Sequence, residues 1–140
     1  MEKYVFGIVI LFALLGQACT DRDIIDAKEG VSLPPVSDLS IGDAGNGKVR
    51  LTWGIPTAIP QAVNQPLNVL VEVRELIESW RSQVVFSSNL ADAPTSFDYD
   101  LPDPSKTYQF TVKLNGRLKE VDPNYSSTIY SLGQSVSYGP

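Results

Sequence analysis

The sequence predicts an all-β fold, a seven-stranded antiparallel β-sandwich that covers residues 34–140. Two observations lead to this prediction. Apolar and polar residues alternate with period two in several segments, as they do in strands with one buried face. Turn-forming residues separate these segments at short intervals, and many short strands with such spacing are typical of two packed antiparallel sheets.

The seven expected strands follow each other closely along the chain. In order, they cover residues 36–41, 48–53, 67–77, 81–86, 97–101, 108–114 and 130–138. The first, fourth and seventh have the weaker alternation. Between the first two, the segment GDAGNG at 42–47 contains residues that tolerate a positive φ, and it lacks the Lys-Ser/Thr of a phosphate-binding loop. We therefore expect a turn there.

The second and third strands have the clearest pattern. In KVRLTW, Val49, Leu51 and Trp53 share one face. The third expected strand runs into VEVRELIESWR, which also contains good helix formers. We favour a strand because the β-branched residues Val69 and Val71 occupy alternate positions.

The segment FDYDLPDP contains three carboxylates, Asp98, Asp100 and Asp103. Oxygen ligands at such close spacing could bind calcium. We favour a simpler interpretation, since Asp98 and Asp100 alternate with Phe97 and Tyr99 and would form the solvated face of the fifth strand. No metal site is therefore expected.

Two stretches resemble the fibronectin type III family. PPVSDLSIGDAGNGKVRLTW resembles its opening, with Val36 and Leu39 in the first strand and Trp53 at the end of the second. DPSKTYQFTVKL resembles its sixth strand. The resemblance implies an immunoglobulin-like sandwich in which Trp53 is buried and Tyr108 is the corner tyrosine, whose hydroxyl bonds back to the backbone.

Residues 1–18 (MEKYVFGIVILFALLGQA) have a basic start, an apolar run and then small residues, which are the features of a secretory signal. The apolar run is too short for a membrane-spanning helix. Cys19, the only cysteine, follows directly, and Leu15, Gly16 and Ala18 before it resemble the lipobox of bacterial lipoproteins. The resemblance implies cleavage before Cys19 and attachment of lipid to it. An ordinary signal peptide with an incidental cysteine is the alternative.

Residues 19–33 are charged and aperiodic, which indicates a solvated tether. A single sandwich behind a lipobox resembles the small surface lipoproteins of Bacteroidetes. The resemblance implies a lipid-anchored protein of the cell envelope, in the outer membrane, at its surface or its periplasmic face. Asp21 and Asp23 are similar to the acidic signals that move such lipoproteins to the outer face.

The composition argues against several kinds of chemistry. The chain has no histidine and one cysteine, so it cannot build a Ser–His–Asp site, a Cys–His site with a free thiol, or a histidine zinc site. A net charge of −5 without basic clusters argues against nucleic acid as a partner. We therefore expect a non-enzymatic protein without a cofactor, modified only by its lipid.

Two long segments, 54–66 and 115–128, connect the second strand to the third and the sixth to the seventh, and in this topology they lie at one end of the sandwich. Antibodies use the equivalent end for recognition. The candidate binding residues of these loops are Ile55, Ile59, Gln61, Asn64, Arg117 and Tyr125. We expect this end to contact an envelope protein, as an interaction module, accessory subunit or spacer. Ordinary irregular connections are the alternative.

A carbohydrate-binding lipoprotein is the second functional expectation. Trp80, Tyr125 and Tyr130 are the aromatic residues least clearly assigned to the core, and an exposed aromatic platform could stack on sugar rings. Against this, Trp80 follows a strand end and could cap the core, while Tyr130 is expected to start the last strand facing inward.

Overall fold

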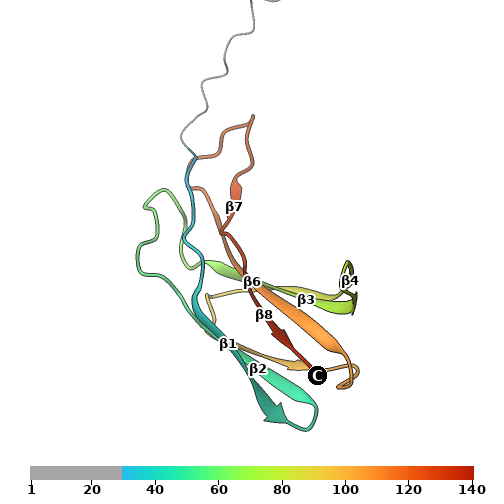
Figure 1. The fold of residues 1–140 in the computed structure, drawn as a ribbon. Coiled ribbons are helices and arrows are strands. Elements are labelled where there is room, and N and C mark those ends of the chain that lie inside the picture. Colours follow the sequence, from blue (N-terminus) through green and yellow to red (C-terminus); the bar gives the residue numbers. More distant parts are fainter. Residues whose placement is uncertain (1–29) are drawn as a thin grey trace, which may run out of the picture. The chain divides into compact units, whose positions relative to one another are not determined.

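The computed structural model describes residues 30–140, which form eight β-strands (Figure 1). The signal segment 1–18 and Cys19 lie outside the described residues. The strands are β1 (Ser37–Gly45), β2 (Lys48–Gly54), β3 (Asn68–Glu78), β4 (Arg81–Leu90), β5 (Ser96–Asp100), β6 (Thr107–Arg117), β7 (Thr128–Tyr130) and β8 (Gln134–Tyr138). Within residues 30–140, no helix is long and apolar enough to cross a membrane.

The strands form two antiparallel sheets. One sheet has the order β1-β2-β5. The other has the order β4-β3-β6, and both β7 and β8 pair with β6. Figure 1 shows β1 and β2 in one layer and β3, β4 and β6 in the other. The architecture is the expected all-β sandwich of the immunoglobulin and fibronectin type III kind.

The core fills the space between the inner faces of the two sheets. Every second residue of β2, β3 and β6 is buried, because alternate side chains of a strand point to the same face. The residues of these strands with no exposed surface are Val49, Leu51, Val69, Val71, Val73, Tyr108, Phe110, Val112 and Leu114. Trp53 is buried at the end of β2, as predicted, and its Nε1 donates a hydrogen bond of 2.8 Å to the carbonyl oxygen of Pro94.

Tyr108 occupies the corner position that the resemblance implied. Its hydroxyl donates a hydrogen bond of 3.2 Å to the carbonyl oxygen of Asp103 and accepts one of 3.2 Å from the backbone N–H of the same residue. The ring is buried in the core, so these bonds fix the connection between β5 and β6 to the start of β6.

Several boundaries differ from the expected ones. The first strand extends to Gly45, so the turn is confined to Asn46 and Gly47, which have φ values of 55° and 75°. The fourth strand extends to Leu90 because it stays paired with β3 along its whole length. Leu33, which was assigned to the tether, is buried, and the compact unit that contains the sandwich begins at Val31.

The last expected strand is divided into β7 and β8. Asn115 pairs with Tyr130, and Val112 pairs with Gln134, so the last segment advances four residues while β6 advances three. The extra residue lies between β7 and β8, where Ser131 keeps contact with β6 through a bond from its backbone N–H to the Leu114 carbonyl oxygen. One inserted residue reverses the alternation of faces. The inward orientation predicted for Tyr130 is therefore wrong, and its side chain is exposed on the outer face.

The strand β4 forms the free edge of its sheet. Its pairing with β3 changes register between Phe86, which is opposite Val73, and Val84, which is opposite Arg74. Val85 is the extra residue of this bulge, and the side chains of Val84 and Val85 are both exposed.

Candidate ligand-binding hollow

The two long loops lie at the same end of the sandwich and are joined to each other. Val63 of the first loop forms an isolated β-bridge with Leu118 of the second. The backbone N–H of Asn64 donates a hydrogen bond of 2.8 Å to the carbonyl oxygen of Arg117, and that of Lys119 donates one of 2.9 Å to Ala62. These bonds continue the sheet beyond β6. We call this region, residues 55–67 and 118–127, the loop end.

Gly116 allows the first loop to approach β6 closely. A Cβ atom on Gly116 would lie 2.6 Å from Cγ1 of Val63 and 2.8 Å from Cδ2 of Leu67, which is closer than real Cβ atoms approach other heavy atoms. The buried side chain of Leu33 also reaches this place, 3.8 Å from the same position. The described chain therefore enters the sandwich at the loop end.

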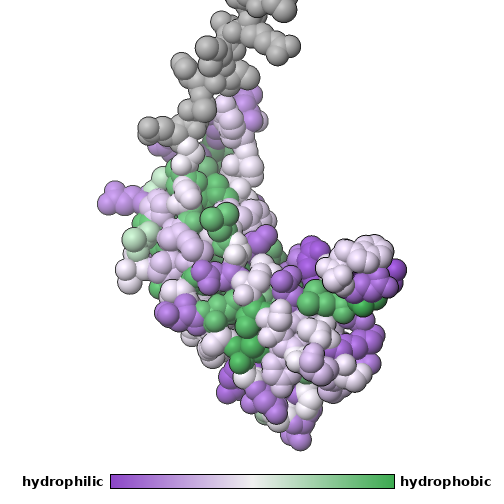
Figure 2. All heavy atoms as spheres, viewed as in Figure 1, coloured by the Kyte–Doolittle hydropathy of each residue, from purple (hydrophilic) through white to green (hydrophobic). Residues whose placement is uncertain are grey.

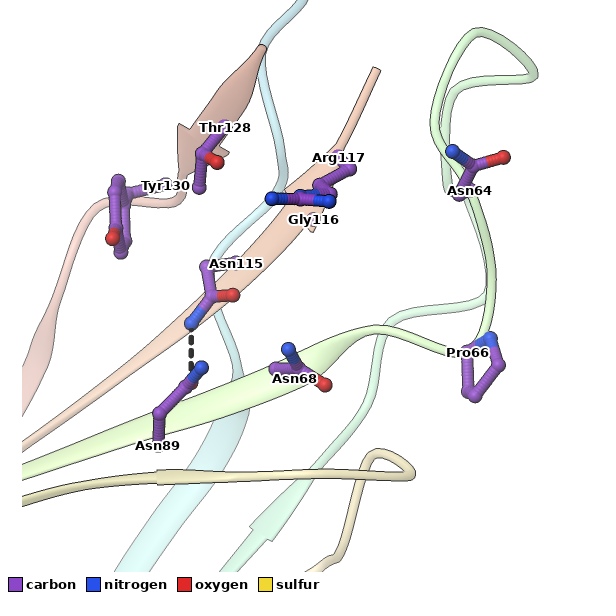
Figure 3. A pocket seen from close by; sticks show the side chains of 9 residues that line it. All are labelled: Asn64, Pro66, Asn68, Asn89, Asn115, Gly116, Arg117, Thr128 and Tyr130. Atoms are coloured by element: carbon purple, nitrogen blue, oxygen red, sulfur yellow. Dashed lines mark hydrogen bonds between the residues drawn. The ribbon is translucent and has the colours of Figure 1, made fainter. Parts of the chain in front are cut away.

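A hollow of about 480 Å³ lies beside the loop end, on the outer face of the larger sheet. It is lined by Asn64, Pro66, Asn68, Asn89, Asn115, Gly116, Arg117, Thr128 and Tyr130 (Figure 3). Strand register brings the polar residues together: Asn115 on β6 is opposite Asn68 on β3 and opposite Tyr130 on β7. Residues paired in this way point to the same face of a sheet.

Four asparagines give the hollow its chemistry. The Nδ2 of Asn115 donates a hydrogen bond of 2.7 Å to Oδ1 of Asn89, drawn as a dashed line in Figure 3. Within residues 30–140, the side-chain amides of Asn64 and Asn68 make no hydrogen bond. Each amide offers two donor hydrogens and an acceptor oxygen, so the floor and rim present both kinds of group.

Tyr130 and Arg117 add an aromatic ring and a positive charge. The Tyr130 side chain is 57% exposed and stands at the opposite side of the hollow from Asn64 (Figure 3). Arg117 is exposed, and it is the only charged residue among the nine that line the hollow. The hollow thus combines amides, one aromatic ring and one guanidinium group.

Three of the residues singled out in the sequence meet in this hollow: Asn64, Arg117 and Tyr130. Ile55 and Ile59 do not, because they are half-buried and pack against the core.

Gln61 and Tyr125 are exposed at the loop end but do not line the hollow. Trp80 lies in the turn between β3 and β4 and is 78% exposed, so it does not cap the core. Asn68 is the first of the eleven residues of β3, and Trp80 lies beyond the last one; at about 3.3 Å per residue the strand alone spans roughly 35 Å. Trp80 and Tyr130 therefore cannot contact the same short oligosaccharide.

Four polar residues of the hollow were not recognised in the sequence: Asn68, Asn89, Asn115 and Thr128. Asn68 and Asn115 stand at the alternating polar positions of β3 and β6. This pattern could have indicated that both side chains lie on the outer face of the sheet. Their proximity depends on the register between strands far apart in the sequence, and alternation within one strand does not contain that information.

The acidic residues of β5 lie on the outer face of the smaller sheet, as predicted. Arg50 donates two hydrogen bonds of 2.6 Å to the Asp98 carboxylate, and these hold the pKa of Asp98 below its ordinary value. Asp100 forms an ion pair of 3.1 Å with Lys48. Asp103 is in the following turn, where it accepts bonds from Ser105. Among residues 30–140, no three potential metal ligands of the His, Cys, Asp or Glu type form a cluster.

Comparison with solved structures finds β-sandwich proteins that are similar to this chain. A β-sandwich protein obtained by computer-based redesign is 16% identical, with a TM-score of 0.49, over 76% of this chain and 88% of that one. A structure of titin kinase and its flanking domains is 17% identical, with a TM-score of 0.50, over 76% of this chain and 16% of that one. At this identity, the likeness concerns the fold alone.

No curated protein matches the chain. Residues 19–138 match the model of the family described as "Domain of unknown function (DUF4945)". Because this match includes most of the sequence, the chain belongs to that family.

Proposed function

We propose that this protein is a non-enzymatic binding module of the bacterial cell envelope that recognises a glycan in the asparagine-lined hollow. The observation that carries the proposal is the convergence of Asn68, Asn89 and Asn115 with the exposed ring of Tyr130 in one hollow of about 480 Å³. A volume of this size is in the range of small-molecule sites. Amides match the paired donors and acceptors of sugar hydroxyls, and a tyrosine ring offers an apolar face.

The proposal includes a lipid anchor on Cys19 and a location in the outer membrane. Its support comes from the signal-like segment 1–18 and from the small residues before the cysteine. The family match also begins at Cys19, the residue that would become the amino terminus after cleavage. A lipid-anchored form would partition into membranes, whereas Cys19→Ser would release the protein into the soluble fraction.

Two substitutions with a matched control test the glycan site. Tyr130→Ala and Asn68→Ala remove side chains that line the hollow, while Tyr125→Ala removes an exposed tyrosine of the loop end that does not line it. We expect each hollow variant to weaken oligosaccharide binding about tenfold, equivalent to about 1.4 kcal/mol, measured by calorimetry on a glycan panel. The control should bind like the unchanged protein. Absence of binding to the whole panel, or equal losses in all three variants, would contradict the proposal.

Protein contact through the loop end is the second candidate function. Val121 and Tyr125 are 71% and 55% exposed on the second loop, and Figure 2 shows further apolar residues on the part of the surface where Figure 1 places the two long loops. Exposed apolar residues in one region can mark a protein-interaction site. Photo-crosslinking from position 121 in living cells, with position 43 on β1 as control, would test it. A specific adduct at 121 alone is expected.

A further inference from the structure

We propose that the ligand of the hollow is an acidic glycan whose anionic substituent is bound by Arg117. This inference rests on the proposed glycan-binding function and specifies the class of sugar. In this proposal, the sugar hydroxyl groups form hydrogen bonds with the asparagines, and the apolar face of a sugar ring stacks on Tyr130. A carboxylate or sulfate of the ligand binds the guanidinium group.

The charge distribution of the hollow supports this inference. Among residues 30–140, Arg117 is the one charged residue of the lining, and none of the aspartates or glutamates of this described part contributes to the wall. Elsewhere in residues 30–140, Lys48, Arg50, Arg74 and Lys106 each form an ion pair with a carboxylate. Among the ion pairs of these described residues, none includes Arg117. The hollow therefore keeps a positive charge in a chain with a net charge of −5.

The backbone of Arg117 is fixed on both sides. Its carbonyl oxygen accepts the 2.8 Å bond from Asn64, and the residue pairs with Thr128 across β6 and β7. Figure 3 shows its side chain between Asn64 and Thr128, beside Asn115. The fixed backbone keeps the origin of the side chain in place, so no backbone ordering at Arg117 is needed when a ligand binds.

The guanidinium group distinguishes acidic from neutral sugars. A planar guanidinium can donate two parallel hydrogen bonds to a carboxylate or sulfate, and such charge-assisted bonds are stronger than bonds to neutral hydroxyls. A neutral sugar occupying the same position would remove water from Arg117 without supplying a negative partner. The asparagines carry no charge and would accept either type of sugar. Arg117 is therefore the residue that should determine the preference.

The test compares three oligosaccharides of equal length and linkage by calorimetry: a galacturonic acid oligomer, the neutral galactose oligomer and its sulfated form. The proteins are the full chain, Arg117→Gln, Arg117→Lys and the control Lys119→Gln. Lys119 is a neighbouring exposed cation that does not line the hollow. Circular dichroism and thermal unfolding verify that each variant is folded.

We expect an anionic oligomer to bind the full chain about 10- to 100-fold more tightly than the neutral one. Arg117→Gln should remove this preference, so that anionic and neutral oligomers bind it equally; Arg117→Lys should keep part of the preference, and Lys119→Gln should keep all of it. The two anionic arms distinguish carboxylate from sulfate.

Two results would overturn the inference alone: equal affinity for neutral and anionic oligomers, or an equal loss of preference in Lys119→Gln, which would indicate general electrostatic attraction. Failure of all three oligomers to bind would instead count against the proposed glycan function itself.

Discussion

Asn115 donates its 2.7 Å hydrogen bond to Asn89 across an intervening strand, since β3 lies between β6 and β4. Asn115 is 5% exposed, and its bond to Asn89 satisfies one of the two donor hydrogens of its side-chain amide. The pair therefore has two roles, because it forms the floor of the hollow and also links β6 to β4 across β3.

Asn89→Ala should destabilise the protein by about 1–3 kcal/mol, because it leaves a nearly buried amide hydrogen of Asn115 without its partner. Urea unfolding at neutral pH would measure the loss. Asn64→Ala is the control, since Asn64 is exposed and its side chain makes no hydrogen bond within residues 30–140. Its effect should stay within about 0.5 kcal/mol. Equal effects of the two substitutions would show that the bond to Asn115 does not contribute.

Gly116→Ala should displace the first loop, because the added methyl group would overlap Val63 and Leu67. We expect a loss of about 1–3 kcal/mol, as for other substitutions that overpack a core, together with weaker ligand binding. Adding Val63→Ala to this variant should recover part of the lost stability and part of the lost ligand binding, since it removes the Val63 Cγ1 atom that the new methyl group would overlap. Gly42→Ala is the matched control in β1, where nothing lies within 4 Å of the added atom. A tolerated Gly116→Ala, with unchanged unfolding, would contradict the close packing described.

Trp53→Ala should reduce the free energy of unfolding by roughly 3–5 kcal/mol, as expected for removing a large buried aromatic residue. Trp53→Phe should cost less, because it keeps most of the ring volume and loses mainly the bond from Nε1 to Pro94. Chemical denaturation followed by circular dichroism would measure both variants. A loss of less than about 1 kcal/mol for Trp53→Ala would mean that the side chain is not part of the core.

Asp98 should make stability depend on pH in the acidic range. The hydrogen bonds from Arg50 lower the pKa of Asp98 in the folded protein from its ordinary value of 3.8. The Arg50–Asp98 pair therefore adds to the free energy of unfolding when the pH is above that ordinary value. This added stability is lost as the pH falls through the lower pKa that Asp98 has in the folded protein. Asp98→Asn should be less stable than the unchanged protein at neutral pH, and the difference should disappear in strong acid.

Urea titrations at a series of pH values would follow this difference. Asp43→Asn, on the neighbouring β1 strand without an ion pair among the described residues, is the control. A difference between Asp98→Asn and the unchanged protein that stays constant down to strong acid would exclude the pair as its source.

Much of the fold could be predicted because, on the inner faces of the sheets, every second residue of a strand is apolar and buried. Val49, Leu51 and Trp53 alternate with polar residues, and all three are buried in the sandwich. Tyr108 was placed by a resemblance, and its hydroxyl makes the backbone bonds implied for that position. Burial of alternate residues is a local property of each strand, which a single sequence contains.

The hollow could not be predicted in the same way. Asn68 and Asn115 meet through pairing of distant strands, and Tyr130 reaches the outer face only because one residue is inserted after it. The apolar residue Leu132 shows why alternation misleads here: it shares the phase of Tyr138, which packs against the core, yet it is largely exposed. The residue that is extra relative to β6 cannot be seen in the alternation of this segment. It nevertheless reverses which side chains face the core and which face outward.

The bulge in β4 has a consequence for how copies of this domain behave at high concentration. An exposed edge strand offers unpaired backbone groups to any other strand, and proteins protect such edges with charges, prolines or bulges. From Ser82 to Leu90, β4 has no charged residue and no proline. The bulge at Val85 is its protection, since a second strand could continue a regular ladder on one side of the bulge only, along Ser82–Val84 or along Phe86–Leu90. The irregularity therefore helps to keep the domains from joining edge to edge into aggregates.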